Sequence, residues 1–206
     1  LINTRIFRLT NKQIFAGSTG EGDGAIQAYN YRMQLSNDSE KRRPITRPDN
    51  YDRERYAGIT GGETARLEKS FPIKSDALYN GVEKVGMGGQ YHCYPGGNHE
   101  YPEADWQGRR EILKAHADHM LGYFYFIQND DSVPEAIRER NRQWGLNKTL
   151  YPDNDNIPYE IYVREARRIR GRYVFREQDG TLAQGYRRAP VHSDSVGVTE
   201  WPMDSH

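Results

Sequence analysis

The segment from Trp106 to Asn129 constrains the fold of this chain more than any other stretch of its sequence. Its apolar residues recur at spacings of three and four, which is the period of an α-helix with one face in a core. One stripe contains Trp106, Leu113, Ala117, Met120, Phe124 and Ile127, and a second beside it contains Ile112, Tyr123 and Phe126. Pro102, Glu103 and Asp105 suit the positively charged start of a helix. We therefore predict a helix over Trp106–Asn129 whose second half is buried.

A second segment with helical periodicity is rich in arginine and runs from Tyr159 to Tyr173. Its apolar residues predict a helix over Pro158–Arg170 with one face in the core: Tyr162, Ala166, Ile169 and Tyr173. Arg164 and Arg168 would share the opposite face, with Glu165 beside them. One interpretation is a solvated face of ion pairs, and the other is a face that binds an anionic ligand, since Arg suits planar, bidentate contacts.

Shorter patterns complete the expected fold. Residues 29–35 alternate apolar and polar, which predicts a strand. Ser132 and Glu135 have the spacing of a capping box, which predicts a short helix over Val133–Trp144. A hairpin is expected over residues 5–16 and a weak helix over Arg53–Lys69. Together these elements predict a single α+β domain over residues 1–206, with a mainly antiparallel sheet and helices packed around it.

Composition excludes some classes of function. The 206 residues include 29 basic and 29 acidic side chains, and this zero net charge argues against a nucleic-acid binder that works by bulk electrostatics. Hydrophobic residues make up only 35% of the chain, and 15 tyrosines supply ring surface that suits clefts and interfaces. No apolar run approaches the length of a membrane span, so no membrane partner is expected. Cys93 is the only cysteine, so an internal disulfide is impossible.

Several polar stretches have a structural and a functional interpretation. The glycines of residues 17–24 resemble a phosphate loop, but Glu21 and Asp23 would repel phosphate and a strand follows, so we interpret the segment as a hinge. The basic run Lys41–Arg43 is expected to be a solvated loop. Residues 71–101 have no assignable element and contain His92 and His99, which are surface residues or line a cleft.

Two histidines, His116 and His119, lie one turn apart on the long predicted helix. That spacing allows both imidazoles to bind one metal ion, but no third ligand is evident on the helix. We therefore predict histidines at the edge of the core and no metal site.

Four segments, in order, resemble a broad family of FAD-dependent oxidoreductases. They are GDGAIQAYNYRMQLS from Gly22, EYPEAD from Glu100, YVREARRIRGRYVF from Tyr162 and DSVGVTEWPMDSH from Asp194. The resemblance covers nearly all of the chain and concerns the middle, substrate-binding portion of such enzymes, in a p-hydroxybenzoate-hydroxylase-like arrangement. A strand–GxGxxG–helix unit, which the family uses for FAD, is absent from these 206 residues.

The resemblance implies a role and a set of site residues. The chain would be the substrate domain of a flavoenzyme that oxidises a small, sugar-like or anionic substrate by hydride transfer to FAD. His206 and Asp204 are the candidates for handling the proton, and Arg164, Glu165, Arg168, His92 and His99 are the candidates for binding the substrate. The expected partner is a nucleotide-binding domain, and the chain alone is expected to be inactive and to bind no FAD. The alternative is a non-catalytic carbohydrate- or ligand-binding module.

Overall fold

The computed structural model describes residues 24–57, 77–79, 93–167, 171–173 and 191–197. The chain divides into two compact units, residues 1–166 with His206 and residues 167–205. All the helices and strands named below belong to the first unit. In the second unit the rings of Tyr173 and His192 lie edge to face with their centroids 5.6 Å apart. The expectation of a single domain stays a prediction.

The long helix α3 spans Trp106–Asn129, as its sequence predicts. Its N-cap residue is Asp105, whose side chain accepts a hydrogen bond from the backbone N–H of Gly108 at 2.8 Å. Its second half is the buried part, which includes Met120, Phe124 and Ile127, each 0% exposed. The first residue differs from the prediction, because Trp106 is 75% exposed and does not join the apolar stripe.

The short helix α4 spans Glu135–Arg142 and packs against α3. The predicted capping box is wrong. Pro134 is the N-cap residue, the Ser132 hydroxyl donates to Asp130, and Glu135 pairs with Arg138 and Arg142. The ion pairs of Glu135 replace the reciprocal bond that a capping box requires. Val133, Ile137 and Trp144 are buried together, as the sequence predicts.

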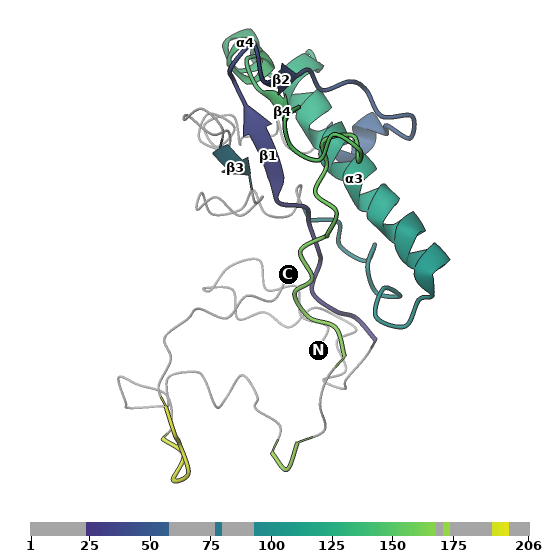
Figure 1. Cartoon of the computed structure of the whole chain (residues 1–206), viewed down its shortest axis with the longest axis vertical. Helices are drawn as coiled ribbons and strands as arrows, with labels where there is room; N and C mark the ends of the chain where they lie inside the picture. Colours follow the sequence, from purple (N-terminus) through teal and green to yellow (C-terminus); the bar gives the residue numbers. More distant parts are fainter. Residues whose placement is uncertain (1–23, 58–76, 80–92, 168–170, 174–190, 198–206) are drawn as a thin grey trace. The chain divides into compact units, whose positions relative to one another are not determined.

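The sheet has four antiparallel strands in the order β2-β4-β1-β3. They are β1 (Met33–Ser36), β2 (Arg42–Arg43), β3 (Ala77–Tyr79) and β4 (Gly145–Asn147). Figure 1 shows β1 in the middle, with α3 beside the sheet. The described residues therefore form an α+β fold with an antiparallel sheet, as expected. The expected solvated loop at Lys41–Arg43 is wrong, because Arg42 and Arg43 pair with Asn147 and Leu146 of β4.

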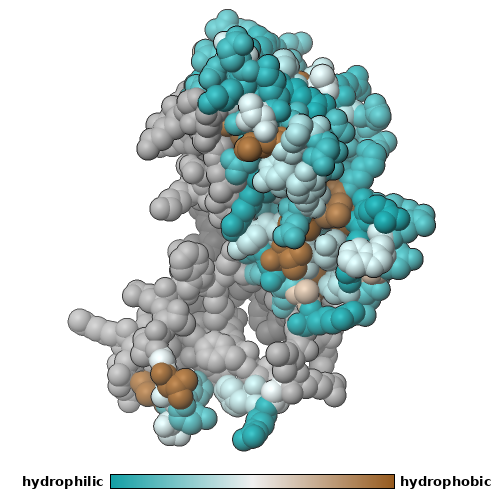
Figure 2. All heavy atoms as spheres, viewed as in Figure 1, coloured by the Kyte–Doolittle hydropathy of each residue, from teal (hydrophilic) through white to brown (hydrophobic). Residues whose placement is uncertain are grey.

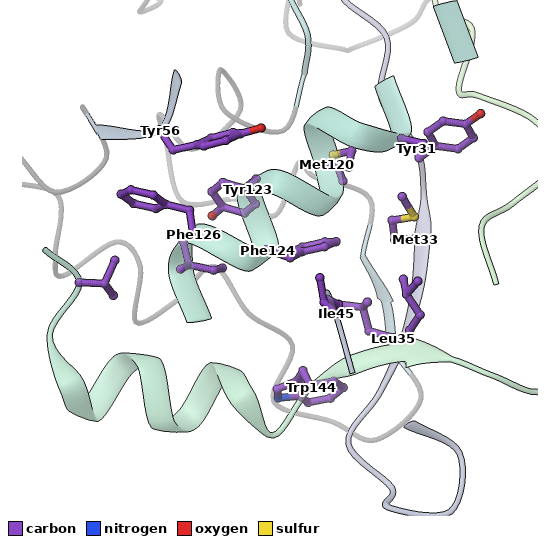
Figure 3. Packing of buried hydrophobic residues seen from close by; sticks show 14 of the residues in the cluster. Tyr31, Met33, Leu35, Ile45, Tyr56, Met120, Tyr123, Phe124, Phe126 and Trp144 are labelled. Carbon is purple, nitrogen blue, oxygen red and sulfur yellow. The ribbon is translucent and has the colours of Figure 1, made fainter. Parts of the chain in front are cut away.

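The core lies between the sheet and α3 (Figure 3). Met33 and Leu35 of β1 face Met120 and Phe124 of α3, and all four side chains are fully buried. Tyr56, which follows the short 3-10 helix η1 (Arg53–Arg55), packs beside Phe126 with ring centroids 5.9 Å apart. Of the helix expected over Arg53–Lys69, only residues 53–57 can be compared with the structure, because residues 58–69 lie outside the described residues. The hairpin expected over residues 5–16 and the glycines of residues 17–23 also lie outside them.

The helix predicted over Pro158–Arg170 is wrong for residues 158–167, which are not helical. Ile161 is 5% exposed, whereas Tyr162 and Val163 are 39% and 42% exposed, so the expected apolar face does not form. The backbone N–H of Tyr162 donates to the carbonyl of Asn30 at 2.8 Å in an isolated antiparallel bridge. A long-range backbone bond therefore takes the donor that a helix would use.

Figure 2 shows a largely hydrophilic surface on the described part of the face drawn, with small hydrophobic patches. Within the described ranges, no helix combines the length and the hydropathy needed to span a membrane.

Candidate functional site

Three segments that are far apart in the sequence meet at the end of the sheet, and we call their contact residues the junction cluster: Gln27, Tyr29, Asn30, Cys93, Asn98 and Glu165. The segments are residues 25–31, 93–98 and 161–165. Backbone bonds join them, from Tyr94 N to Tyr29 O at 3.4 Å and from Tyr162 N to Asn30 O at 2.8 Å. Side chains add the bonds from Asn98 Nδ2 to Gln27 O at 2.8 Å and from Gln27 N to Glu165 Oε2 at 3.4 Å.

Tyr29 is the central side chain of the junction cluster and is 0% exposed. Its hydroxyl donates to the backbone carbonyl of Glu165, and its ring lies edge to face with Tyr101 at 5.6 Å. Burial raises the pKa of the Tyr29 hydroxyl, and Tyr101 adds to that effect, while a hydrogen bond with Asn98 lowers it. Tyr29 is therefore a neutral donor at physiological pH, which suits a clamp between segments.

Two buried amides lie beside Tyr29. Asn30 and Asn98 are 1% and 0% exposed, and Asn30 Nδ2 lies 3.5 Å from Cys93 Sγ. Within the described part of the chain, neither Asn30 Oδ1 nor Asn98 Oδ1 has a hydrogen-bond partner. The cluster thus presents buried carbonyl acceptors, which favour a bound water or another donor group.

Three of the residues that the sequence singled out lie in the described structure, and their role as a site stays a prediction. Glu165 belongs to the junction cluster, where its carboxylate accepts from a backbone amide. Arg164 precedes it in non-helical chain and is half-buried, and His99 is exposed. Arg168, His92, Asp204 and His206 lie outside the described residues.

Sequence reasoning missed the amides of the junction cluster. The alternation of residues 29–35 places Asn30 on the solvated face, yet Asn30 is buried by the segments that cross it. An asparagine in an otherwise regular strand pattern was the available signal, but it does not reveal which distant segment covers it.

The histidines of α3 form a second buried group. His116 and His119 are 1% and 7% exposed, so both belong to the core rather than its edge. The ring of Tyr94 stacks on His119 with centroids 4.9 Å apart and lies edge to face with His116 at 5.3 Å. In the part of the chain that the structure describes, no group of three or more His, Cys, Asp or Glu residues could hold a metal ion.

Comparison with known proteins identifies the class of this chain. The sequence model of the FAD dependent oxidoreductase family matches residues 3–206. The chain therefore belongs to the FAD dependent oxidoreductase family. No curated protein and no solved structure matches it.

The described residues do not fit the pyrophosphate of FAD, which needs free backbone amides at the start of a helix. At the start of α3 the Asp105 carboxylate already occupies the amide of Gly108. The carboxylates of Asp131 and Glu135 flank the start of α4. The glycine-rich segment is not followed by a helix either, because residues 25–31 contain none. No chemical step is therefore assigned to FAD at these residues.

Proposed function

We propose that this chain forms the substrate-facing part of an FAD-dependent oxidoreductase that acts on a small organic substrate. The observation that carries the proposal is the family match over residues 3–206. The α+β arrangement of the described residues, with an antiparallel sheet and two helices, is consistent with a substrate domain of the p-hydroxybenzoate-hydroxylase-like type.

The flavin would be held by a nucleotide-binding part other than the residues described here. This step of the proposal is supported by two observations, the absence of a strand–GxGxxG–helix unit from the sequence and the acidic starts of α3 and α4. Substrate would be bound by this chain, with Arg164, Glu165, Arg168, His92 and His99 as candidate contacts and Asp204 and His206 as candidates for the proton.

The test compares this chain with the larger flavoprotein that the proposal requires. Chain 1–206 alone is expected to bind no stoichiometric FAD, measured as flavin absorbance after gel filtration, because its sequence contains no strand–GxGxxG–helix unit for the pyrophosphate. The larger protein is expected to be yellow, and its bound flavin is expected to be reduced when substrate is added. A stoichiometric yellow complex of the chain alone contradicts the division of roles, and a larger protein without flavin contradicts the function.

The exposed tyrosines favour one alternative, a module that binds carbohydrate without chemistry. Tyr159 is 56% exposed, and its hydroxyl is bonded to Asp153, so its ring is held in place at the surface. Such rings can stack on the apolar face of a sugar. Binding of soluble glycans that is lost in Tyr159→Ala, together with no flavin in any larger form of the protein, supports this alternative.

A further inference from the structure

The side chain of His116 is buried in a way that suits only its neutral form. It is 1% exposed, and its Nδ1 lies 2.8 Å from the carbonyl oxygen of Ile112. Since a carbonyl accepts, Nδ1 carries the proton and Nε2 presents a lone pair. Within the described residues Nε2 has no hydrogen-bond partner. A proton on Nε2 would therefore create a buried charged donor without an acceptor.

The described groups that face His116 offer a second proton no compensation. Tyr94 faces it from the 93–101 segment, His119 lies one turn along α3, and Tyr56 packs against His119 with centroids 5.6 Å apart. The guanidinium of Arg55 lies 5.5 Å from the centre of the Tyr94 ring, so the charge held against this ring is positive. Burial lowers the pKa of His116, the hydrogen bond to Ile112 opposes that shift, and no carboxylate of the described residues contributes.

The 93–101 segment contributes the part of the described His116 environment that lies outside the helices and strands. His116 itself lies in the middle of a helix of 24 residues that forms the core. The 93–101 segment has no helix or strand. Three contacts join it to residues 25–31: the bond from Tyr94 N to Tyr29 O, the bond from Asn98 to Gln27, and the contact of Asn30 with Cys93. Movement of Tyr94 would let water reach Nε2 and would loosen the junction cluster at the same time.

We propose that the 93–101 segment is a pH-sensitive latch, which protonation of His116 releases from α3 and from residues 25–31. At neutral pH the latch is closed and the junction cluster is intact. In acid, water replaces the Tyr94 ring beside His116, and the junction cluster opens on the side of Asn98. The pH response of the latch does not depend on whether the chain is part of a flavoenzyme.

The test is hydrogen exchange of the whole chain at about pH 7.5 and about pH 5.5, on either side of the ordinary histidine pKa of about 6.5. After correction for intrinsic exchange, the amides of residues 93–101 and 25–31 are expected to lose protection in acid. The loss can reach tenfold per pH unit between the unfolded and folded pKa values, because one pKa unit corresponds to a factor of ten. The amides of α3 are expected to change less.

Three matched variants identify the histidine responsible. His116→Gln replaces the imidazole N–H with an amide N–H and cannot titrate. In this variant the exchange protection of residues 93–101 is expected to be independent of pH. His99→Gln changes the exposed histidine of the same segment and is expected to keep the pH dependence. The proposal is overturned if wild type shows no local loss in acid, or if His119→Gln rather than His116→Gln removes it.

A measurement on the wild type covers the case in which His116→Gln does not fold. The imidazole resonances of His116 are followed by NMR during a titration with acid. They are expected to titrate below about pH 6.5 with the same midpoint as the amides of residues 93–101. Separate midpoints would overturn the proposal.

Discussion

At the scale of single residues, Gly122 shows how closely Tyr56 packs on α3. A glycine inside a helix usually costs about 1 kcal/mol relative to alanine, so Gly→Ala is stabilising where space allows. Here a β-carbon at Gly122 would clash with the Tyr56 hydroxyl and lie 3.1 Å from its Cζ atom. That hydroxyl is fixed, because it donates to the carbonyl of His119 at 2.8 Å. We expect Gly122→Ala to lower the free energy of unfolding by about 1–3 kcal/mol, measured by urea denaturation.

Gly108 provides the matched control on the same helix. A β-carbon there meets its nearest atom, Ala104 Cβ, at 3.2 Å, and it lies near the exposed start of α3. Gly108→Ala should leave stability unchanged or raise it by up to about 1 kcal/mol. Tyr56→Phe in the Gly122→Ala background should recover part of the loss, since it removes the clashing oxygen. Equal stabilities of the two alanine variants would contradict the packing described here.

The buried hydroxyl of Tyr31 predicts a loss of stability in alkali. Burial raises the pKa of Tyr31 from 10.0 to about 12, with Tyr101 contributing, and the residue is 3% exposed. The unfolded chain therefore loses this proton at a lower pH than the folded chain. Stability from this group is present below about pH 10 and falls as the pH rises towards 12. Urea midpoints from about pH 8 to about pH 11.5 should fall in wild type and fall less in Tyr31→Phe.

At the scale of elements, α3 supplies most of its core side chains from its second half. Phe124 is 0% exposed and faces Met33 and Leu35 of β1 (Figure 3). Phe124→Ala should destabilise the fold by about 3–5 kcal/mol, through lost burial and the cavity that remains. Trp106→Ala at the exposed start of the same helix should change stability by less than about 0.5 kcal/mol. Comparable losses in the two variants would show that the described core is wrong.

The elements also show what the sequence could predict. The bounds of α3 follow from local properties, an apolar period and the Asp105 cap, so both ends were predicted. Residues 158–167 have a similar period, but their structure depends on the distant backbone of Asn30. The sheet position of Arg42 and Arg43 depends likewise on pairing with β4. The roles of the candidate site residues stay predictions. Of the three described residues only Glu165 joins the junction cluster, because that cluster is built from contacts across 63 to 138 residues.

At the scale of the whole first unit, the junction cluster joins segments that are far apart in the sequence. Tyr29→Phe tests how much this cluster contributes to stability. The substitution keeps the buried ring and removes the hydrogen bond to the Glu165 carbonyl. The net loss in global stability should be about 0.5–1.5 kcal/mol, typical of one hydrogen bond. Hydrogen exchange should show the larger effect, because segments held by few bonds open before the core does. Amides of residues 161–166 and 25–30 should lose more protection than those of α3.

Tyr159→Phe is the control for this prediction, because it also removes one tyrosine hydroxyl bond. Its partner, Asp153, is only six residues away and the ring is 56% exposed, so the bond ties no distant segments together. Its global stability should change by less than about 0.5 kcal/mol, as for most surface substitutions. If Tyr29→Phe alters exchange no more than Tyr159→Phe, the hydroxyl of Tyr29 is not a clamp. If Tyr29→Phe lowers protection equally throughout α3 and the junction cluster, the three segments belong to the same cooperative unit as the core. The latch at residues 93–101 would then open only when the core opens.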